Sequence, residues 1–323
     1  MNLQIIERKS PILGTSQLAC LREVTTVNLT AGCAHGCAYC YTRGYSTFPG
    51  EGTVRLYANL AERLKEELRR KRKLPKRVYF SPSSDLFQPL DEIRKTALEV
   101  LQILFGAGVE VAFLTKGTIP EPHFRLLERF PTLCFAQMGL ITTDDRVRLI
   151  FEPNAASVAV RLAQIERLRR AGIPVTVRLD PILPEVTDSI ESFDAICKAT
   201  SQCGVRNLAA SVLFLRTGFA AHLARRFSEC DVPADLQPCL SRLLMRFRTA
   251  RPLVIHAGGS QTLALPLPER AAIFTRLAAS AARHSQTLHL CTCKNPDLPA
   301  DFFDAQKFVG CEIAGESRGG LFG

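Results

Sequence analysis

The chain has 323 residues, of which 46% are hydrophobic and 22% charged, and its formal net charge is +10. This length and composition are those of a folded globular protein, either one large domain or a domain with an appended part, and they exclude a low-complexity chain. The N-terminal residues MNLQIIERKS are charged where a secretory signal would be apolar, and the most apolar window, 99–114, contains Gln102, Glu110 and two glycines. We therefore expect a cytoplasmic protein that does not span a membrane.

From residue 24 onward, short β-rich segments alternate with longer helical ones. Strands are expected at 24–29, 77–81, 109–115, 133–140, 173–179 and 205–214, and helices at 54–73, 91–105, 121–130, 157–171 and 189–200. The strand segments are nearly continuous apolar runs, as is typical of strands that are covered on both faces. Strands and helices that alternate in this way predict an α/β fold with parallel strands and right-handed helical crossovers.

The regular alternation of predicted strands and helices ends after residue 214. Helices are expected at 234–249 and 268–285, with short strands in LVIHAGG and LHLCTC. We place a boundary near residue 216, which gives an N-terminal segment (1–23), a β/α unit (24–216) and a C-terminal α/β extension (217–323).

The basic run RRKRKLPKR, residues 69–77, contributes much of the excess charge. A basic balance favours contact with nucleic acid, nucleotides or other anions. The run itself is better interpreted as the solvated end of a helix, where cations oppose the negative end of the helix dipole.

Cysteines are unusually frequent: the chain has twelve. In a reducing compartment such a number favours metal or cluster ligation over disulfides. Cys33, Cys37 and Cys40 follow the spacing C-x3-C-x2-C directly after the first strand of the β/α unit. Three thiolates on a tight loop can bind three irons of a cubane cluster and leave the fourth without a protein ligand. A zinc site is the main alternative, but structural zinc usually needs a second pair of ligands. His35 could complete such a set, but it lies between two of the cysteines, where ligation would strain the loop.

This triplet, with the aromatic Tyr39 before its third cysteine, resembles that of the radical S-adenosylmethionine (SAM) superfamily. The resemblance implies a partial (β/α)6 barrel in which Cys33, Cys37 and Cys40 hold a [4Fe-4S] cluster. It also implies that SAM binds the open iron, and that an external one-electron donor such as flavodoxin or ferredoxin drives cleavage of a sulfur–carbon bond.

The segments SPSSDLFQP, FLTKG, FEPNAAS and RLRRAGIPVTVRLDPILP stand in the order found in the spore photolyase-like branch of that superfamily. The resemblance implies that Ser84 and Asp85 contact SAM, that Lys116 faces its carboxylate and that Arg178 lies near the ribose or the substrate. Polar residues at the carboxyl ends of parallel strands do point into the mouth of a barrel, although Ser84 and Asp85 are also placed to cap a helix. Two weaker cofactor-binding candidates are Glu152 and Tyr39, the latter as a shield for one face of the cluster.

A second cysteine group lies near the C-terminus, where Cys291 and Cys293 have C-x-C spacing and Cys311 follows. Residues i and i+2 of a strand face the same way, so two thiols side by side would suit a second cluster, a soft metal or trivalent arsenic. The alternatives are a buried pair, or a zinc site with Cys311 and a histidine such as His289. Within the superfamily, arsinothricin-pathway enzymes resemble such an arrangement, and this resemblance implies transfer of the 3-amino-3-carboxypropyl group of SAM to arsenic.

The sequence thus predicts a radical SAM enzyme, of transferase or lyase type, with three hypotheses for its role. The first is a small thiophilic substrate such as arsenite, bound by Cys291, Cys293 and Cys311 as catalytic residues. The second is repair of a nucleic-acid lesion, against which the absence of tryptophan and the five tyrosines count because they leave few stacking platforms. The third is a non-enzymatic scaffold that binds a metal or a cluster.

Overall fold

The computed structural model describes residues 1–16, 21, 24–216, 219–248, 250–254, 261–290, 294–299 and 302. These residues form a central eight-stranded sheet and two three-stranded sheets. Among them, no helix is both long and apolar enough to cross a membrane.

The central sheet confirms the expected α/β architecture. Its parallel strands lie in the order β3 (Thr25–Val27), β6 (Arg77–Phe80), β7 (Glu110–Thr115), β8 (Cys134–Gly139), β9 (Val175–Ile182), β10 (Asn207–Val212) and β14 (Thr287–Leu290). The short strand β2 (Gly14–Thr15) pairs with β3 in the antiparallel direction at one edge. Each of the six predicted strands is therefore present, and all of them run in one direction.

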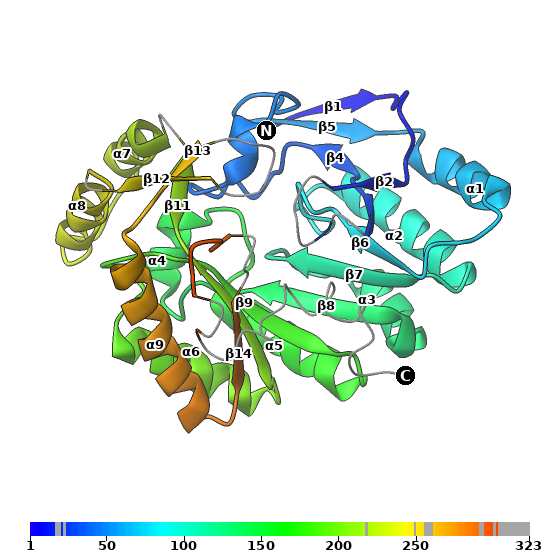
Figure 1. The fold of residues 1–323 in the computed structure, drawn as a ribbon. Coiled ribbons are helices and arrows are strands. Elements are labelled where there is room, and N and C mark those ends of the chain that lie inside the picture. The colour runs from blue at the N-terminus through cyan, green and yellow to red at the C-terminus, as the bar shows by residue number, and fades with distance from the viewer. Residues whose placement is uncertain are drawn as a thin grey trace.

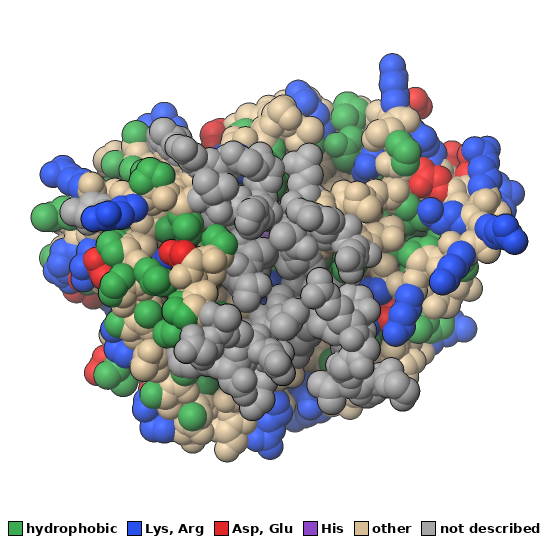
Figure 2. All heavy atoms as spheres, viewed as in Figure 1, with side chains coloured by type: hydrophobic (Ala, Val, Ile, Leu, Met, Phe, Trp, Pro, Cys, Tyr) green, Lys and Arg blue, Asp and Glu red, His purple; other side chains and the backbone are tan. Residues whose placement is uncertain are grey.

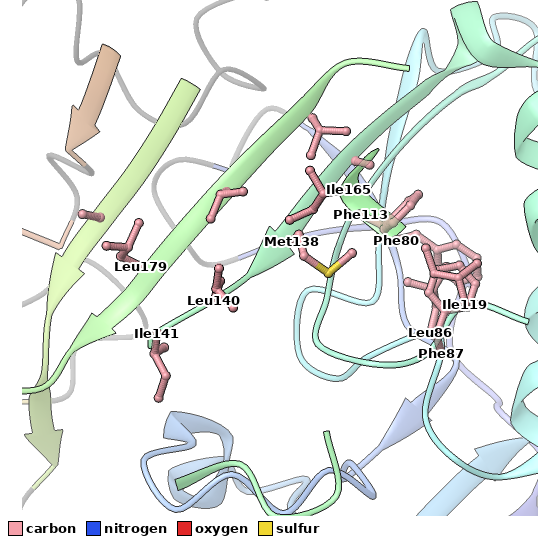
Figure 3. Close-up of a cluster of buried hydrophobic side chains, with 14 of the residues drawn as sticks. Phe80, Leu86, Phe87, Phe113, Ile119, Met138, Leu140, Ile141, Ile165 and Leu179 are labelled. Carbon is pink, nitrogen blue, oxygen red and sulfur yellow. The ribbon is translucent and has the colours of Figure 1, made fainter. Parts of the chain in front are cut away.

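Helices cover one face of this sheet, as Figure 1 shows. They are α2 (Asp91–Gly106), α3 (Glu121–Arg129), α5 (Val158–Arg170), α6 (Ile190–Gln202) and α9 (Leu267–Arg283), and α1 (Leu60–Arg70) packs on α2. The side chains beneath them are apolar. Figure 3 shows Phe80, Leu86, Phe87 and Ile119 gathered in this core, where the rings of Phe87 and Phe113 meet edge to face.

The opposite face of the sheet, called the inner face below, carries polar side chains on β8, β9 and β14, beside an apolar cluster that includes Tyr79 and Ala112. Cross-strand partners point to the same side, and the register pairs Gly139 with Arg178, Arg178 with Ala209 and Ala209 with His289. On this face Gln137 Oε1 accepts hydrogen bonds from Tyr79 (3.3 Å) and Arg178 (3.2 Å). The expectation of strands that are covered on both faces is confirmed in β9, where every residue from Val175 to Leu179 is buried, although some of the covered side chains are polar.

The prediction of one helix over residues 54–73 is wrong in its first part. Residues Thr53–Tyr57 form a strand, β5, and α1 begins only at Leu60. In β5 the buried residues alternate, Val54 and Leu56, because the strand pairs with β1 (Asn2–Ile6) on one side and β4 (Thr30–Ala31) on the other. Within α1 the residues Leu60, Leu64 and Leu68 are buried, as their spacing predicts.

The part of the chain beyond residue 216 joins the same body. Strand β14 pairs with β10, and α9 packs on α6, where Asp194 pairs with Arg283 (2.9 Å) and His284 (3.2 Å). A third sheet, β11 (Phe214–Arg216), β13 (Gln261–Ala264) and β12 (Arg251–Val254), is antiparallel and lies beside α7 (Phe219–Glu229) and α8 (Gln237–Arg246). The predicted boundary near 216 stays a prediction.

The basic run 69–77 lies at the end of α1. Residues 71–73 are exposed, and Figure 2 shows Lys and Arg side chains gathered at the edge of the molecule where Figure 1 places α1. Arg77 differs, since it pairs with Glu110 (2.7 Å) and its guanidinium lies over the ring of Phe135. The exposed part of the run has the geometry of a solvated helix end.

Candidate active site at the cysteine loop

The three clustered cysteines lie on the loop between β4 and the short 3-10 helix η2 (Tyr41–Gly44). Their thiols are free, and all three residues are partly exposed. Two glycines shape the loop, because Gly32 and Gly36 have φ angles of +81° and +63°, which favour glycine. At Gly32 a Cβ would also lie 2.7 Å from the carbonyl oxygen of Thr53.

Side-chain amides clamp this loop from two sides. The N–H of Ala34 donates to Gln88 Oε1 (2.7 Å), and Gln88, which is fully buried, donates to Thr30 Oγ1 (3.0 Å). On the other side Asn154 Nδ2 donates to the carbonyl of Ala34 (3.0 Å). The loop is thus tied to the segments that follow β6 and α4 (Asp145–Phe151), which are far from it in sequence.

The imidazole of His35 bridges the same two segments. Its Nδ1 lies 3.1 Å from the carbonyl oxygen of Asn154, and its Nε2 lies 3.1 Å from Asp85 Oδ2. Because both ring nitrogens face protein partners inside a buried site, His35 belongs to the packing of the loop.

Asp85 is buried and surrounded by donors. Its carboxylate accepts hydrogen bonds from the hydroxyl of Thr115 (2.9 Å) and from the backbone N–H of Phe87 and of Lys116 (2.8 Å each). Burial alone would raise the pKa of Asp85, but His35 and these N–H groups bring the pKa below its ordinary value. Asp85 therefore holds the cysteine loop, the segment after β6 and the end of β7 together as an ionised carboxylate.

Ser84 and Asp85 do not cap the helix that follows them, because α2 begins after Leu90 without a side-chain cap. The Ser84 hydroxyl oxygen is buried and has no hydrogen-bond partner among the described residues. A buried hydroxyl without a partner is costly in free energy. Direct contact of Ser84 and Asp85 with SAM stays a prediction.

Lys116 follows β7 and reaches toward the cysteine loop. Its ammonium lies 5.8 Å from the centre of the Tyr39 ring. The side chain crosses Gly139, where a Cβ would lie 2.8 Å from Lys116 Cγ. Within the described part of the chain, no carboxylate lies close enough to form an ion pair with this ammonium.

A buried ion pair lies next to Tyr39 and contacts its hydroxyl. Glu152 Oε2 is 2.6 Å from Arg161 Nη2, both side chains are almost completely buried, and the Tyr39 hydroxyl donates to Glu152 Oε1. Arg161 also donates to the carbonyl of Gly139 (2.9 Å) at the end of β8. Burial acts to raise the pKa of Glu152, but Arg161 and Lys116 outweigh it and the pKa is lowered. Glu152 thus contacts the loop through Tyr39, and a contact with SAM stays a prediction.

The donor set fits a cationic centre. Burial raises the pKa of the Cys37 thiol to about 12, with a further contribution from Glu152, and burial together with Asp85 raises that of Cys33. Three thiolates beside two carboxylates would repel one another unless positive charge lies between them. No three described His, Cys, Asp or Glu side chains converge on a single ion position, and a cubane cluster does not need this because each thiolate binds a different iron.

Arg178 lies on the inner face of β9. Besides its hydrogen bond to Gln137, it forms an ion pair with Asp180 (2.8 Å between Nη2 and Oδ2), and Lys294 pairs with the same oxygen. Sequence reasoning did not single out Asp180, Lys294, Gln88, Asn154 or Arg161. Cys291, Cys293 and Cys311 lie outside the described residues.

Comparison of the amino-acid sequence with known families and proteins gives a result that is consistent with the three-cysteine site. A family model described as the Radical SAM superfamily matches residues 27–196. The chain is 27% identical over 175 residues to a Radical SAM Nalpha-GlyT isomerase of Pseudomonas phage M6, which covers 54% of this chain and 36% of the isomerase. It is 28% identical over 236 residues to an uncharacterised protein of Mycobacterium tuberculosis, which covers 68% of this chain and 69% of the relative. The chain thus matches about a third of the length of the phage relative.

Structure comparison shows the same fold in solved proteins. A spore photoproduct lyase mutant with bound AdoMet and dinucleoside spore photoproduct superposes with a TM-score of 0.66 at 12% identity, over 89% of this chain and 81% of the lyase. Streptococcus suis SuiB bound to S-adenosylmethionine gives a TM-score of 0.54 at 10% identity, over 90% of this chain and 57% of SuiB.

Proposed function

The chain belongs to the radical SAM superfamily and is an enzyme, and from this premise we propose that it cleaves SAM reductively at a [4Fe-4S] cluster held by Cys33, Cys37 and Cys40. The observation that carries the proposal is the arrangement of three free thiols on one clamped loop, with the ammonium of Lys116 beside it. Membership of an enzyme superfamily sets aside the hypothesis of a non-enzymatic scaffold.

We assign a role at this site to each of the residues around the cysteine loop. A bound cluster would supply one electron and an open iron to SAM. Lys116 would hold the carboxylate of SAM, because its ammonium has no ion-pair partner among the described residues and a charge-assisted hydrogen bond would give it one. Ser84 would offer its buried hydroxyl to the polar end of SAM. Arg178 would contact the ribose or the substrate, and Tyr39, whose hydroxyl donates to Glu152, would cover one face of the cluster.

For the substrate, we propose a small thiophilic compound, with trivalent arsenic receiving the 3-amino-3-carboxypropyl group of SAM. The C-x-C pair, Cys291 and Cys293, together with Cys311 would bind it, since thiolates are the ligands that soft centres prefer. Two described neighbours support this: His289 lies on the inner face of β14, and Lys294, the residue after Cys293, pairs with Asp180 at the end of β9. The same cysteines are the candidates for a second cluster.

A second candidate is a nucleic-acid lesion as substrate. It is favoured by the net charge of +10 and by the cations Arg178 and Lys294 on the inner face. In this case we expect the affinity for nucleic acid to fall steeply as the salt concentration rises, because contacts to phosphates release counterions.

The test is anaerobic reconstitution of the full chain with iron and sulfide, followed by reaction of the reduced protein with SAM. Mass spectrometry then separates 5′-deoxyadenosine from methylthioadenosine, the product of 3-amino-3-carboxypropyl transfer. Methylthioadenosine together with a new arsenic species, formed only when arsenite is added, supports the thiophilic substrate. Salt-sensitive DNA binding without an arsenic product supports the second candidate, and no cleavage of SAM contradicts the proposed function.

Lys116→Met tests the residue assignment. We expect the variant to keep its iron and to bind SAM about 10 to 100 times more weakly, the loss of one hydrogen bond between charged groups. Lys198→Met, which changes an exposed residue of α6, is the matched control and should bind SAM as the wild type does. Equal SAM affinity in both variants would remove Lys116 from the site.

A further inference from the structure

Residues 151–156 connect α4 to α5 and lie against the cysteine loop. The backbone N–H of Ala38 donates to the carbonyl of Phe151 (2.8 Å), and the backbone N–H of Asn154 donates to the carbonyl of His35 (3.3 Å). These bonds add to those of the Asn154 side chain and of the His35 ring described above. The α4–α5 connection, the name used below for residues 151–156, therefore fixes the backbone between the first and the third cysteine of the loop.

The same connection holds the residue that reaches toward the cysteine loop from β7. The backbone N–H of Ala156 donates to the carbonyl of Lys116 (2.8 Å). The carbonyl of Ala156 in turn accepts a hydrogen bond from Arg161 Nε of α5 (2.9 Å). Gln164 of the same helix donates to the carbonyl of Gly117 (3.1 Å), so α5 also holds the next residue. The backbone from which the Lys116 side chain extends is thus tied to the segment that holds the loop.

Arg148 of α4 stabilises the connection from within. Its side chain is only 8% exposed, its Nη1 donates to the carbonyls of Glu152 and Ala155 (3.2 Å each), and its Nε pairs with Asp145. A buried guanidinium that binds two carbonyls of one short segment keeps that segment in one conformation, because each carbonyl would otherwise lose a partner. These partners all belong to α4 or to the connection. Arg148 therefore acts on the cysteine loop and on Lys116 only through the connection.

The separation between the cysteine loop and Lys116 matters for SAM. In the proposed function, SAM binds the open iron of a cluster on the loop and, through its carboxylate, the ammonium of Lys116. One molecule can make both contacts well only if the two partners are held at the right distance, and small errors of position are costly. The α4–α5 connection is hydrogen-bonded to both of them.

We propose that the α4–α5 connection sets the distance between the cysteine loop and Lys116, and that Arg148 and Asn154 are positioning residues for SAM. The proposal rests on the proposed function, because it takes the cluster to lie on this loop and the carboxylate of SAM to lie at Lys116. It adds a role for a segment of the chain that supplies none of the three thiols.

The experiment compares two arginines of α4. Arg148→Met removes the buried guanidinium, and Arg146→Met is the matched control, since the Arg146 side chain is 56% exposed and also pairs with carboxylates, those of Asp144 and Asp235. The full-length variants are reconstituted anaerobically with iron and sulfide, and the electron paramagnetic resonance spectrum of the reduced protein is titrated with SAM. We expect Arg148→Met to keep its iron and to bind SAM about three to ten times more weakly, the effect of one lost hydrogen bond. Arg146→Met should bind SAM as the wild type does, and Arg148→Lys, which keeps a charged donor, should recover part of the affinity.

A second measurement reports on the loop itself. Hydrogen exchange followed by mass spectrometry should show that the Ala38 amide exchanges about three to ten times faster in Arg148→Met than in Arg146→Met, because its acceptor is the carbonyl at the start of the connection. Asn154→Ala, at an exposed position, removes one contact with the loop and empties no buried site. It should weaken the binding of SAM in the same direction, and it decides the question if urea denaturation shows that Arg148→Met does not fold.

The contrary results are definite. Equal SAM affinity in Arg148→Met and Arg146→Met, or in Asn154→Ala and the wild type, would overturn the proposal. A failure of the proposed function is seen in the wild type itself, as the absence of a cluster spectrum or of any change in that spectrum when SAM is added.

Discussion

Gly117 shows how the absence of one side chain brings two segments together at the site. It follows Lys116, and a Cβ at this position would lie 2.2 Å from the carbonyl oxygen of Phe87 and 3.2 Å from His35 Cε1. The segment after β6, which carries Asp85, can approach the end of β7 only because this position is a glycine. The FLTKG motif therefore needs its glycine for packing, in addition to any role of its lysine.

The first prediction follows from this contact. Gly117→Ala should lower the free energy of unfolding by about 3 kcal/mol or more, because the neighbouring atom is backbone and the backbone must move. Gly106→Ala is the matched control: no atom lies within 4 Å of its Cβ, and alanine in α2 should leave stability unchanged or raise it slightly. Urea denaturation measures both, and a Gly117→Ala variant as stable as the control would show that the two segments do not meet in this way.

At the scale of single residues, local spacing made it predictable that Cys33, Cys37 and Cys40 lie together, because all three belong to one short loop; their role as cluster ligands stays a prediction. Lys294 and Asp180 were not predictable. They are 114 positions apart in the chain, and nothing near either residue indicates the partner. Tyr79 and Gln137 of the inner face were hidden for another reason, since each stands alone in an apolar run, whereas Arg178 was named only through the resemblance.

At the scale of elements, the Glu152–Arg161 pair joins the end of α4 to α5, and Tyr39 joins both to the cysteine loop. The pair is almost completely buried, so its partners depend on each other: removal of one leaves the other as an unpaired buried charge, which costs about 3–5 kcal/mol. The second prediction is therefore that Glu152→Gln lowers the free energy of unfolding by this amount at neutral pH.

The pH dependence of this effect has a definite sign. The pKa of Glu152 in the folded protein lies below its value in the unfolded chain, which is about 4.3. The ionised carboxylate thus contributes its full stabilisation above that value and loses it as the pH falls toward the folded pKa. The difference in unfolding free energy between wild type and Glu152→Gln should shrink from pH 7 toward pH 3, measured by urea denaturation. Glu62→Gln, at an exposed position of α1, is the control, and a difference that stays constant with pH would contradict the ionised pair.

Elements were predictable where the chain repeats one pattern. The alternation of apolar strands with amphipathic helices predicted the strands of the central sheet, whereas β5 was assigned to a helix. The fourfold spacing of Leu60, Leu64 and Leu68 was extended backward over Val54 and Leu56, which alternate instead. The strand exists because β1 and β4 pair with it, and pairing across such distances is invisible to a local pattern.

At the scale of the whole molecule, the C-terminal part completes structures that the first 216 residues leave open. Strand β14 covers the edge of β10, and α9 packs on α6, where Asp194 pairs with Arg283 and His284. An exposed strand edge beside an exposed apolar surface promotes aggregation. The same part of the chain also supplies Lys294, which pairs with Asp180 of β9.

The third prediction is that a fragment of residues 1–216 does not fold as an independent unit, although the change of rhythm in the sequence places a boundary there. The fragment would expose the edge of β10 and lose the ion pairs of Asp194 with Arg283 and His284. We expect it to aggregate or to lack a cooperative thermal transition, as measured by near-ultraviolet circular dichroism and size-exclusion chromatography. A fragment of residues 1–302, which keeps α9, β14 and Lys294, is the matched control and should unfold cooperatively. A cooperative transition of the shorter fragment at the same temperature would establish the boundary near 216 as a true domain boundary, and the ion pair of Lys294 with Asp180 would then join two domains.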